Sequence, residues 1–311
     1  MSNFSTLPDD LLELDGYIDR NESIHNLKPH TEAKIAWHHS KEPRQTDLSI
    51  VYLHGFKASH PEGHPVHRNI AKSLEANLYL SRLQEHGLVS ACPLQHLTEQ
   101  KLIQSARHAI AIGQKIGHKT VLMGTSTGGS LALYLAAQPE LRKSIAAVIL
   151  YAPLIRLYGL NDLLLKYKSL RNLFSHIPGK SYPLRSKGIS EAGERIWNKS
   201  YALQGALALG EFINRYMQPD LFSEISAPVF TGYYYKNNQK QDRVISVNAI
   251  KWMIPHLGTP SANIYTEVFP EAGSHVICSP ITSRAVSNVI KRTKAFLKAI
   301  NLCPETPKMS V

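Results

Sequence analysis

The stretch VLMGTSTGGS, residues 121–130, places Ser126 between glycines directly after a short apolar run. The helix-forming run SLALYLAA, residues 130–137, follows, so the local pattern is strand, tight turn and helix. A nucleophile elbow holds a serine in a strained conformation at such a turn, and it needs very small residues two positions to either side. Gly124 and Gly128 meet that need. The stretch therefore predicts that Ser126 is a nucleophile, with a structural Gly/Ser turn as the alternative.

Two other glycine-rich loops are excluded by the residues around the serine. A phosphate-binding P-loop ends in Gly-Lys-Ser/Thr, whereas Leu131 and Ala132 follow here and no lysine is within reach. A dinucleotide-binding loop needs Gly-x-Gly-x-x-Gly, and Gly124, Gly128 and Gly129 do not have that spacing.

The bulk composition is that of an ordinary globular protein, with 311 residues, 43% hydrophobic and 19% charged. The net charge of +11 is spread over most of the chain without a basic run or a basic-aromatic alternation, so we expect a solvated basic surface and no nucleic-acid partner. A preference for anionic ligands stays open as an alternative. No apolar run is long enough to span a bilayer, and the amino terminus lacks a signal-peptide pattern, so a cytoplasmic location is expected. Cys92, Cys278 and Cys303 are scattered, which favours a reducing compartment, and no role is assigned to them.

Apolar runs alternate with helix-period segments from about residue 30 onward. This alternation predicts a single α/β domain with a mainly parallel central sheet and helices on both faces. Strands are predicted at 32–37, 48–53, 77–82, 119–123, 146–151, 228–234 and 263–269, and helices at 65–75, 98–116, 127–138, 246–256 and 281–301.

One segment interrupts the alternation. Residues 154–226 are too many for an ordinary connection, and they contain helical patches at 160–169 and 203–216. We therefore predict an inserted helical cap over this range. Its Leu, Ile and Tyr residues are expected to pack the cap on the sheet, with lining of a substrate pocket as the alternative.

A serine nucleophile needs a base, and the base needs a carboxylate that fixes its tautomer. His275 lies in a turn-rich loop just after the predicted strand 263–269, at the end of the sheet where open-sheet active sites gather. Asp242 is the only acid in the loop 236–245 after another predicted strand. The order Ser126, Asp242, His275 is the chain order of one hydrolase architecture. The alternatives are a loop histidine without a task and an aspartate that caps the next helix or pairs with Arg243.

Acyl transfer also needs hydrogen-bond donors for the oxyanion. The backbone N–H of Thr127, directly after the serine, is one candidate, and the N–H of Phe56 in the loop Leu53-His54-Gly55-Phe56 is the second. His54 is predicted to be a structural histidine that bonds the backbone of this loop.

Four motifs in this order, YLHGF at 52–56, GTSTGG at 124–129, DRVIS at 242–246 and GSHVI at 273–277, resemble the α/β-hydrolase superfamily. The resemblance covers about residues 30–300 and is nearest to the esterases, monoacylglycerol lipases and lysophospholipases. The stretch RLQEHG at 82–87 is similar to the Gly-His-Gly loop of those lipases, with Glu85 in place of the first glycine. The resemblance implies that Ser126 is the nucleophile, His275 the base, Asp242 the orienting acid, and Phe56 and Thr127 the oxyanion donors.

Two positions depart from the pattern of those enzymes. Thr125 stands where lipases and esterases often carry histidine, and Thr127 replaces their usual methionine or glutamine. Because the oxyanion would bind the backbone N–H of Thr127, the chemistry is expected to be unaffected. The serine at 126 argues against the related dehalogenases and epoxide hydrolases, which attack with aspartate.

These observations predict a serine hydrolase that cleaves carboxylic esters with an apolar acyl group through an acyl-enzyme on Ser126. Thioester hydrolysis, peptidase or acyltransferase chemistry with the same triad is one alternative, and a binding protein without catalysis is another. No cofactor is expected. The loop HGFKASHPEGHPVH, residues 54–67, carries four histidines without a metal-binding i, i+4 pair and supporting acid, so no metal site is predicted.

Overall fold

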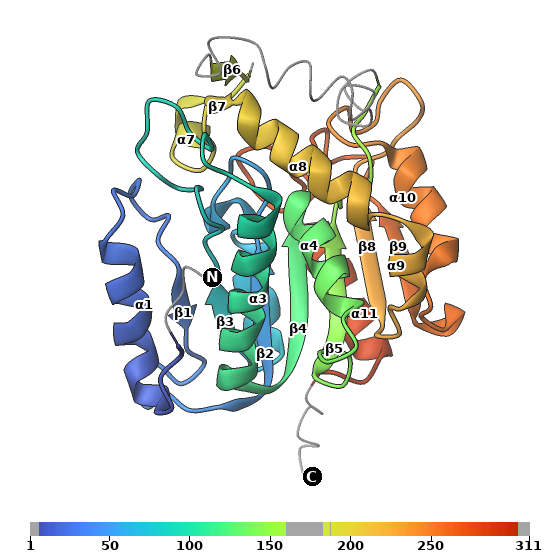
Figure 1. Ribbon diagram of the computed structural model, residues 1–311. Coiled ribbons are helices and arrows are strands. Elements are labelled where there is room, and N and C mark those ends of the chain that lie inside the picture. The colour runs from blue at the N-terminus through green and yellow to red at the C-terminus, as the bar shows by residue number, and fades with distance from the viewer. Residues whose placement is uncertain (1–5, 160–182, 187, 304–311) are drawn as a thin grey trace.

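The computed structural model describes residues 6–159, 183–186 and 188–303. Its central sheet has seven strands in the order β1-β3-β2-β4-β5-β8-β9 (Figure 1). Neighbouring strands are parallel, except that β1 pairs antiparallel with β3 at one edge. The bounds are β1 Lys34–Ala36, β2 Thr46–Leu53, β3 Asn77–Leu80, β4 Gly117–Thr125, β5 Ile145–Tyr151, β8 Val229–Tyr233 and β9 Ile264–Val268. The predicted mainly parallel sheet is confirmed, and each of these strands lies at a predicted position.

Helices cover both faces of the sheet, as predicted. The longer ones are α1 Leu14–Ser23, α2 Val66–Ser73, α3 Glu99–Ile116, α4 Thr127–Ala136, α8 Leu203–Tyr216, α10 Val247–Met253 and α11 Val286–Ala299. Two separate clusters of buried side chains make up the core. One contains Leu102 of α3 and Leu131 of α4, and the other contains Ile70 of α2 and Phe296 of α11. The sheet is thus buried on both faces, which explains why its central strands are continuous apolar runs.

Helix α1 lies before residue 30, where the sequence analysis predicts no element. Its buried side chains are only Leu14, Tyr17 and Ile18, so the apolar pattern is too short to stand out from polar neighbours. The hydroxyl of Tyr17 lies 3.0 Å from Nε2 of His108 on α3, which attaches α1 to the main body of the fold. Packing against the rest of the fold therefore stabilises this helix, and its sequence pattern alone is too weak to predict it.

The chain between β5 and β8 contains the helices α7 Glu191–Glu194, α8 and α9 Pro219–Ser223. It also contains an antiparallel pair of short strands, β6 Pro183–Arg185 and β7 Ser200–Ala202. Helix α8 has the predicted bounds 203–216, whereas the predicted helix at 160–169 lies outside the described residues. Figure 1 shows α8 crossing the end of the sheet above α3 and α4, with β6 and β7 beyond it. Helix α8 therefore lies over the end of the sheet at which the parallel strands finish. Across the described ranges, no helix combines the length and the apolar character needed to cross a bilayer.

Candidate active site

Ser126 occupies a sharp turn between β4 and α4. Its backbone has φ 53° and ψ −116°, a left-handed conformation that costs a residue with a side chain of the order of 1–3 kcal/mol. The surrounding hydrogen bonds hold it there: its N–H donates to the carbonyl of Tyr151 at 2.9 Å, and its own carbonyl accepts the N–H of Leu154 at 3.1 Å. The side chain is 7% exposed. A serine held in such a conformation by its neighbours is typical of a nucleophile elbow.

The glycines beside Ser126 leave no room for a side chain. A Cβ at Gly128 would overlap the carbonyl oxygen of Leu53 at the end of β2, and a Cβ at Gly124 would overlap the backbone of Gly128. Strand β2, strand β4 and helix α4 can approach this closely only because both residues are glycine.

We expect Gly128→Ala to lower the free energy of unfolding by more than about 4 kcal/mol, because rigid backbone must move to accommodate the methyl group. Gly16→Ala is the matched control. A Cβ at Gly16 would lie 3.4 Å from the flexible side chain of Arg20, so this change in a helix is expected to stabilise the protein by about 0.5–1 kcal/mol. Urea unfolding of both variants measures the difference, and equal effects would contradict the close packing at the turn.

His275 and Asp242 come from two different loops and meet at the end of the sheet. Nδ1 of His275 lies 2.6 Å from Oδ2 of Asp242. Asp242 is 1% exposed, and the His275 side chain is 13% exposed. When Nδ1 of His275 donates its proton to this carboxylate, Nε2 of the neutral ring keeps a free lone pair. This is the tautomer that a histidine needs to act as a base.

Both oxygens of the Asp242 carboxylate form hydrogen bonds. Its Oδ1 accepts the backbone N–H groups of Val244 at 2.8 Å and Ile245 at 3.1 Å, which fixes the carboxylate within its own loop. The sequence also allowed Asp242 to cap the next helix or to pair with Arg243. Ser246 instead caps α10 by accepting the N–H of Ala249, and Arg243 donates to the carbonyl of Gln239. Asp242 therefore points one oxygen at its loop and the other at His275.

A third loop, which follows β2, lies close to both Ser126 and His275. Gly55 of that loop is so close to Ser126 that a Cβ on it would lie 3.3 Å from the Ser126 Cβ, and Glu62 of the same loop interacts electrostatically with His275. Among the described residues, the Ser126 hydroxyl forms no hydrogen bond with His275. Hydrogen bonds of this kind are often long in an unliganded site and tighten when substrate binds.

The charges around His275 set its pKa. Burial lowers this pKa, but the negative charge of Asp242, its hydrogen bond and the charge of Glu62 outweigh burial and the nearby Lys57, so the pKa lies above its ordinary value of 6.5. The protonated form is thus favoured by the neighbouring acids, as a histidine that collects a proton during catalysis requires.

The raised pKa predicts the acid side of the pH profile. A histidine base works only when neutral, so kcat/KM should fall as the pH drops. The midpoint of this fall should lie above pH 6.5. The same shift means that His275 adds to folding stability below its unfolded pKa and that this contribution is lost as the pH rises through its folded pKa. Initial rates at constant ionic strength test this, and an acid limb centred below pH 6.5 would contradict the assignment.

The two predicted oxyanion donors lie at the start of α4 and in the turn after β2. Thr127 begins α4, so its N–H is one of the first helical N–H groups that lack an intrahelical partner. The N–H of Phe56 lies in the turn after β2. Within the described residues, neither N–H donates to a protein acceptor. The hydroxyl of Thr127 is buried and also has no partner there.

His54 orients the peptide unit that carries the Phe56 N–H. Its Nε2 accepts the N–H of Leu83 at 3.1 Å, so its Nδ1 carries the proton and donates to the carbonyl of Gly55 at 2.9 Å. Because the carbonyl and N–H of a trans peptide point in opposite directions, this bond turns the Phe56 N–H away from His54. Burial, together with the nearby His86, holds the pKa of His54 well below 6.5. His54 is therefore a structural histidine bonded to the backbone, as predicted.

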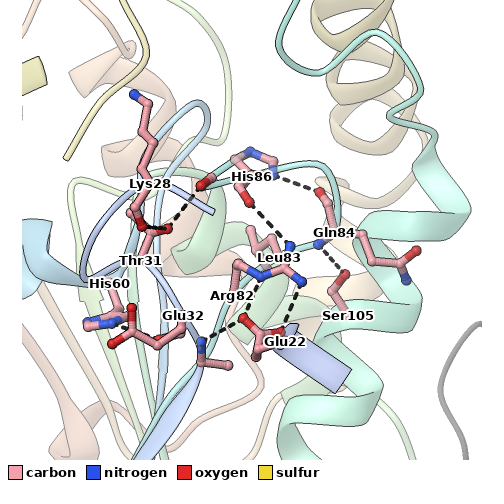
Figure 2. A network of polar contacts seen from close by, with 12 residues as sticks. Glu22, Lys28, Thr31, Glu32, His60, Arg82, Leu83, Gln84, His86 and Ser105 are labelled. Carbon is pink, nitrogen blue, oxygen red and sulfur yellow. Dashed lines mark hydrogen bonds and ion pairs between the residues drawn. The ribbon is translucent and has the colours of Figure 1, made fainter. Parts of the chain in front are cut away.

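A buried ion pair positions the loop that bonds His54. Arg82 donates to Glu22 of α1 through Nε at 2.6 Å and Nη2 at 2.9 Å, and Figure 2 shows this pair directly beside Leu83. Glu85 in the same loop has φ 66°, and Gly87 has φ 71°. Glu85 therefore adopts the left-handed conformation that a glycine takes most readily.

Two further histidines of the loop after β2, His60 and His67, each lie within hydrogen-bond distance of a backbone carbonyl. Nε2 of His60 lies 3.1 Å from the carbonyl of Glu32, and Nε2 of His67 lies 3.2 Å from the carbonyl of His60. Nowhere in the described ranges do three or more metal-binding side chains form a group that could hold an ion. Burial lowers the pKa of His60 to about 3, which keeps this side chain neutral.

Sequence reasoning missed Glu62 in the same loop. This carboxylate is 1% exposed and accepts the indole Nε1–H of Trp197 at 2.9 Å and the backbone N–H of Gly55. In the sequence, Glu62 stands in a polar stretch that reads as an ordinary surface loop, so no local signal marks it as buried.

No family model matches the chain, and no curated protein sequence is similar to it. The structure is similar to that of a metagenome-derived lipolytic enzyme of the LipS and LipT pair, with a TM-score of 0.67 and 14% identity over 88% of this chain and 99% of the other. A monoacylglycerol lipase from Paleococcus ferrophilus aligns with a TM-score of 0.61 and 12% identity, over 86% and 99% of the two chains.

A third solved structure extends the comparison beyond lipases. The enol-lactonase from Burkholderia xenovorans aligns with a TM-score of 0.55 and 14% identity, over 86% of this chain and 96% of the other. At such low identities the likeness concerns the fold and not the reaction. The shared strand order, the helices on both faces and the extent of these alignments establish that the chain has the α/β-hydrolase fold.

Proposed function

We propose that the protein is a serine hydrolase that cleaves carboxylic esters, with Ser126 as nucleophile, His275 as base and Asp242 as the orienting acid. The observation that carries the proposal is the 2.6 Å hydrogen bond between His275 and the buried Asp242, at the sheet end where Ser126 is held at φ 53°. A loop histidine or aspartate without a task would not need this pairing. The solved structures with the same fold include lipolytic enzymes, which supports a hydrolase.

The proposed reaction follows from the groups at the site. Nε2 of His275 removes the proton from the Ser126 hydroxyl as its oxygen attacks the acyl carbonyl. The N–H groups of Phe56 and Thr127 bind the oxyanion, and His275 then protonates the leaving alcohol. Water then gives a proton to the same nitrogen as its oxygen attacks the acyl-enzyme, and His275 returns that proton to the Ser126 oxygen as the acid is released.

We propose an apolar acyl group and a capping role for residues 154–226. Two observations support this. The half-buried ring of Phe56 packs edge-on against Tyr201 from the chain between β5 and β8, with centroids 5.2 Å apart. Helix α8 lies across the ends of α3 and α4 (Figure 1). Apolar side chains from both the loop after β2 and the chain between β5 and β8 would favour a hydrocarbon chain over a polar group.

The test combines turnover with covalent labelling. The protein is assayed on p-nitrophenyl esters from acetate to palmitate and incubated with a fluorophosphonate probe, with the labelled peptide located by mass spectrometry. We expect ester hydrolysis and one label on the peptide that contains Ser126. Labelling without ester hydrolysis would move the proposal to thioesters or peptides as acyl donors, or to an acyl acceptor other than water. Folded protein with neither activity nor labelling would overturn it.

A further inference from the structure

Glu62 is a buried acid outside the proposed triad. It lies in the short 3-10 helix η2, His60–Gly63, between β2 and α2. In the described part of the chain, no lysine or arginine forms an ion pair with it. A buried carboxylate without an ion pair costs free energy unless hydrogen bonds compensate for its lost hydration. Its position therefore needs an explanation beyond packing.

Each carboxylate oxygen of Glu62 accepts one N–H group, and the two donors come from different parts of the fold. Oε1 accepts the backbone N–H of Gly55, and Oε2 accepts Nε1–H of Trp197 at 2.9 Å. A Cβ at Gly55 would lie 3.1 Å from Glu62 Oε1 and 3.3 Å from the Cβ of Ser126. The carboxylate and the serine therefore both border the space that the missing side chain of Gly55 leaves open.

The bond to Gly55 acts on the turn that presents the Phe56 N–H. Glu62 holds the N–H of Gly55, and His54 holds the carbonyl of Gly55, so the peptide units on both sides of Gly55 are fixed. Fixing both units determines the direction of the Phe56 N–H, because only the dihedral angles of Gly55 link them.

The bond to Trp197 belongs to a wider contact between this loop and the chain that precedes α8. Ser59 donates its hydroxyl to the carbonyl of Ile196 at 3.0 Å, and the N–H of Asn198 donates to the carbonyl of Lys57 at 2.8 Å. Trp197 is 7% exposed, so its indole is packed between the two segments. Glu62 is the side chain that joins this contact to Gly55.

We propose that Glu62 is a positioning residue of the oxyanion site, which fixes the turn at Gly55 and ties it to Trp197 in the segment between β5 and β8. The proposal rests on the serine hydrolase function proposed above. It assigns Glu62 no contact with substrate. Its effect on the reaction would pass through the Phe56 N–H and through the charge it presents to His275.

The electrostatic surroundings of Glu62 support a role near neutral pH. Burial raises the pKa of its carboxyl to about 7, against the N–H donors of Gly55 and Trp197 and the charges of His275 and Lys57. Tyr52 and Cys278 also face it, and burial raises both of their pKa values well above the ordinary ones, so they stay neutral. Protonation would convert one accepting oxygen into a donor and break one of the two hydrogen bonds.

Glu62→Gln is the central test, because an amide keeps the shape but can accept only one of the two N–H groups. We expect kcat to fall by about 10- to 100-fold while KM changes by less than about threefold, since an oxyanion donor is misplaced and not removed. The acid limb of kcat/KM should also move to lower pH, because His275 loses a charge that raises its pKa. Glu140→Gln, at a side chain 55% exposed, is the matched control and should change neither quantity.

Trp197→Phe separates the two bonds, because it removes the indole N–H and keeps an aromatic ring. We expect a smaller loss of kcat, about fivefold, and a double variant with Glu62→Gln that is no slower than Glu62→Gln alone. The ¹⁵N indole resonance of Trp197, assigned by its loss in Trp197→Phe, should titrate near pH 7 in the unaltered protein and stop titrating in Glu62→Gln. This signal reports on the hydrogen bond without any catalytic activity.

The outcomes separate this inference from the proposed function. Unaltered protein without hydrolysis or fluorophosphonate labelling would refute the function, and the positioning role would fall with it even if the indole signal titrates. Active enzyme whose kcat and acid limb survive Glu62→Gln would refute the positioning role alone. Losses in the two single variants that multiply in the double variant would refute the link between Gly55 and Trp197.

Discussion

Ser126→Ala is expected to lower kcat for p-nitrophenyl esters by about 10⁵- to 10⁶-fold and to abolish labelling by a fluorophosphonate. The reason is that the serine oxygen forms the acyl-enzyme, and the remaining groups can only bind substrate and stabilise an oxyanion. KM should change little, because the hydroxyl contributes to the reaction and not to ground-state binding. Initial rates at saturating substrate, with the background hydrolysis subtracted, provide the measurement.

Two further variants control for folding. Ser23→Ala alters an exposed serine at the end of α1 and should keep full activity. Ser126→Gly should be as inactive as Ser126→Ala but should unfold at an equal or higher temperature than the unaltered protein, since glycine adopts φ 53° without strain. Residual activity above about 1% in a folded Ser126→Ala protein would exclude this serine as the nucleophile.

Asp242→Asn is expected to lower kcat by about 10⁴-fold. The hydrogen bonds from Val244 and Ile245 to Oδ1 determine how the asparagine would sit. Its amide oxygen would keep those two bonds, so its NH2 group would face Nδ1 of His275. That nitrogen would then have to accept a hydrogen bond, the ring proton would move to Nε2, and the lone pair that the base needs would be lost.

The pH profile provides a second readout for Asp242→Asn. Without the negative charge that raises the pKa of His275, the remaining activity should have its acid limb at lower pH than the unaltered protein. Asp19→Asn, at an exposed position on α1, is the matched control and should leave both rate and profile unchanged. A kcat within about tenfold of the unaltered protein would show that Asp242 does not orient the base.

The sheet and its helices could be predicted from the sequence because their signals are local. The buried run around Val121 is apolar without interruption, and the glycines beside Ser126 mark the turn that follows. Strands at both ends of the chain, and α8 with its bounds, lie where periodicity placed them. Helix α1 escaped prediction because only three of its side chains are buried, and the antiparallel direction of β1 has no signature in so short a strand.

The candidate triad residues could be listed from the sequence, but their contacts could not. Ser, Asp and His in this order, each after a predicted strand, indicated which loops to compare, because parallel strands end at the same edge of a sheet. Nothing local indicated that Asp242 divides its oxygens between its own loop and His275. That division depends on a histidine 33 residues away along the chain.

By itself, the sequence determined the fold class and the turn at Ser126, because alternating apolar runs and flanking glycines are local signals, and it indicated a backbone role for His54. Only the tertiary structure decided that Glu62 is buried and joined to Gly55 and to Trp197, 135 residues away. A charged residue in a polar loop reads as exposed, since charged side chains are rarely buried. Whether it is buried depends on hydrogen-bond donors that folding brings together from distant parts of the chain, and a linear pattern does not contain that information.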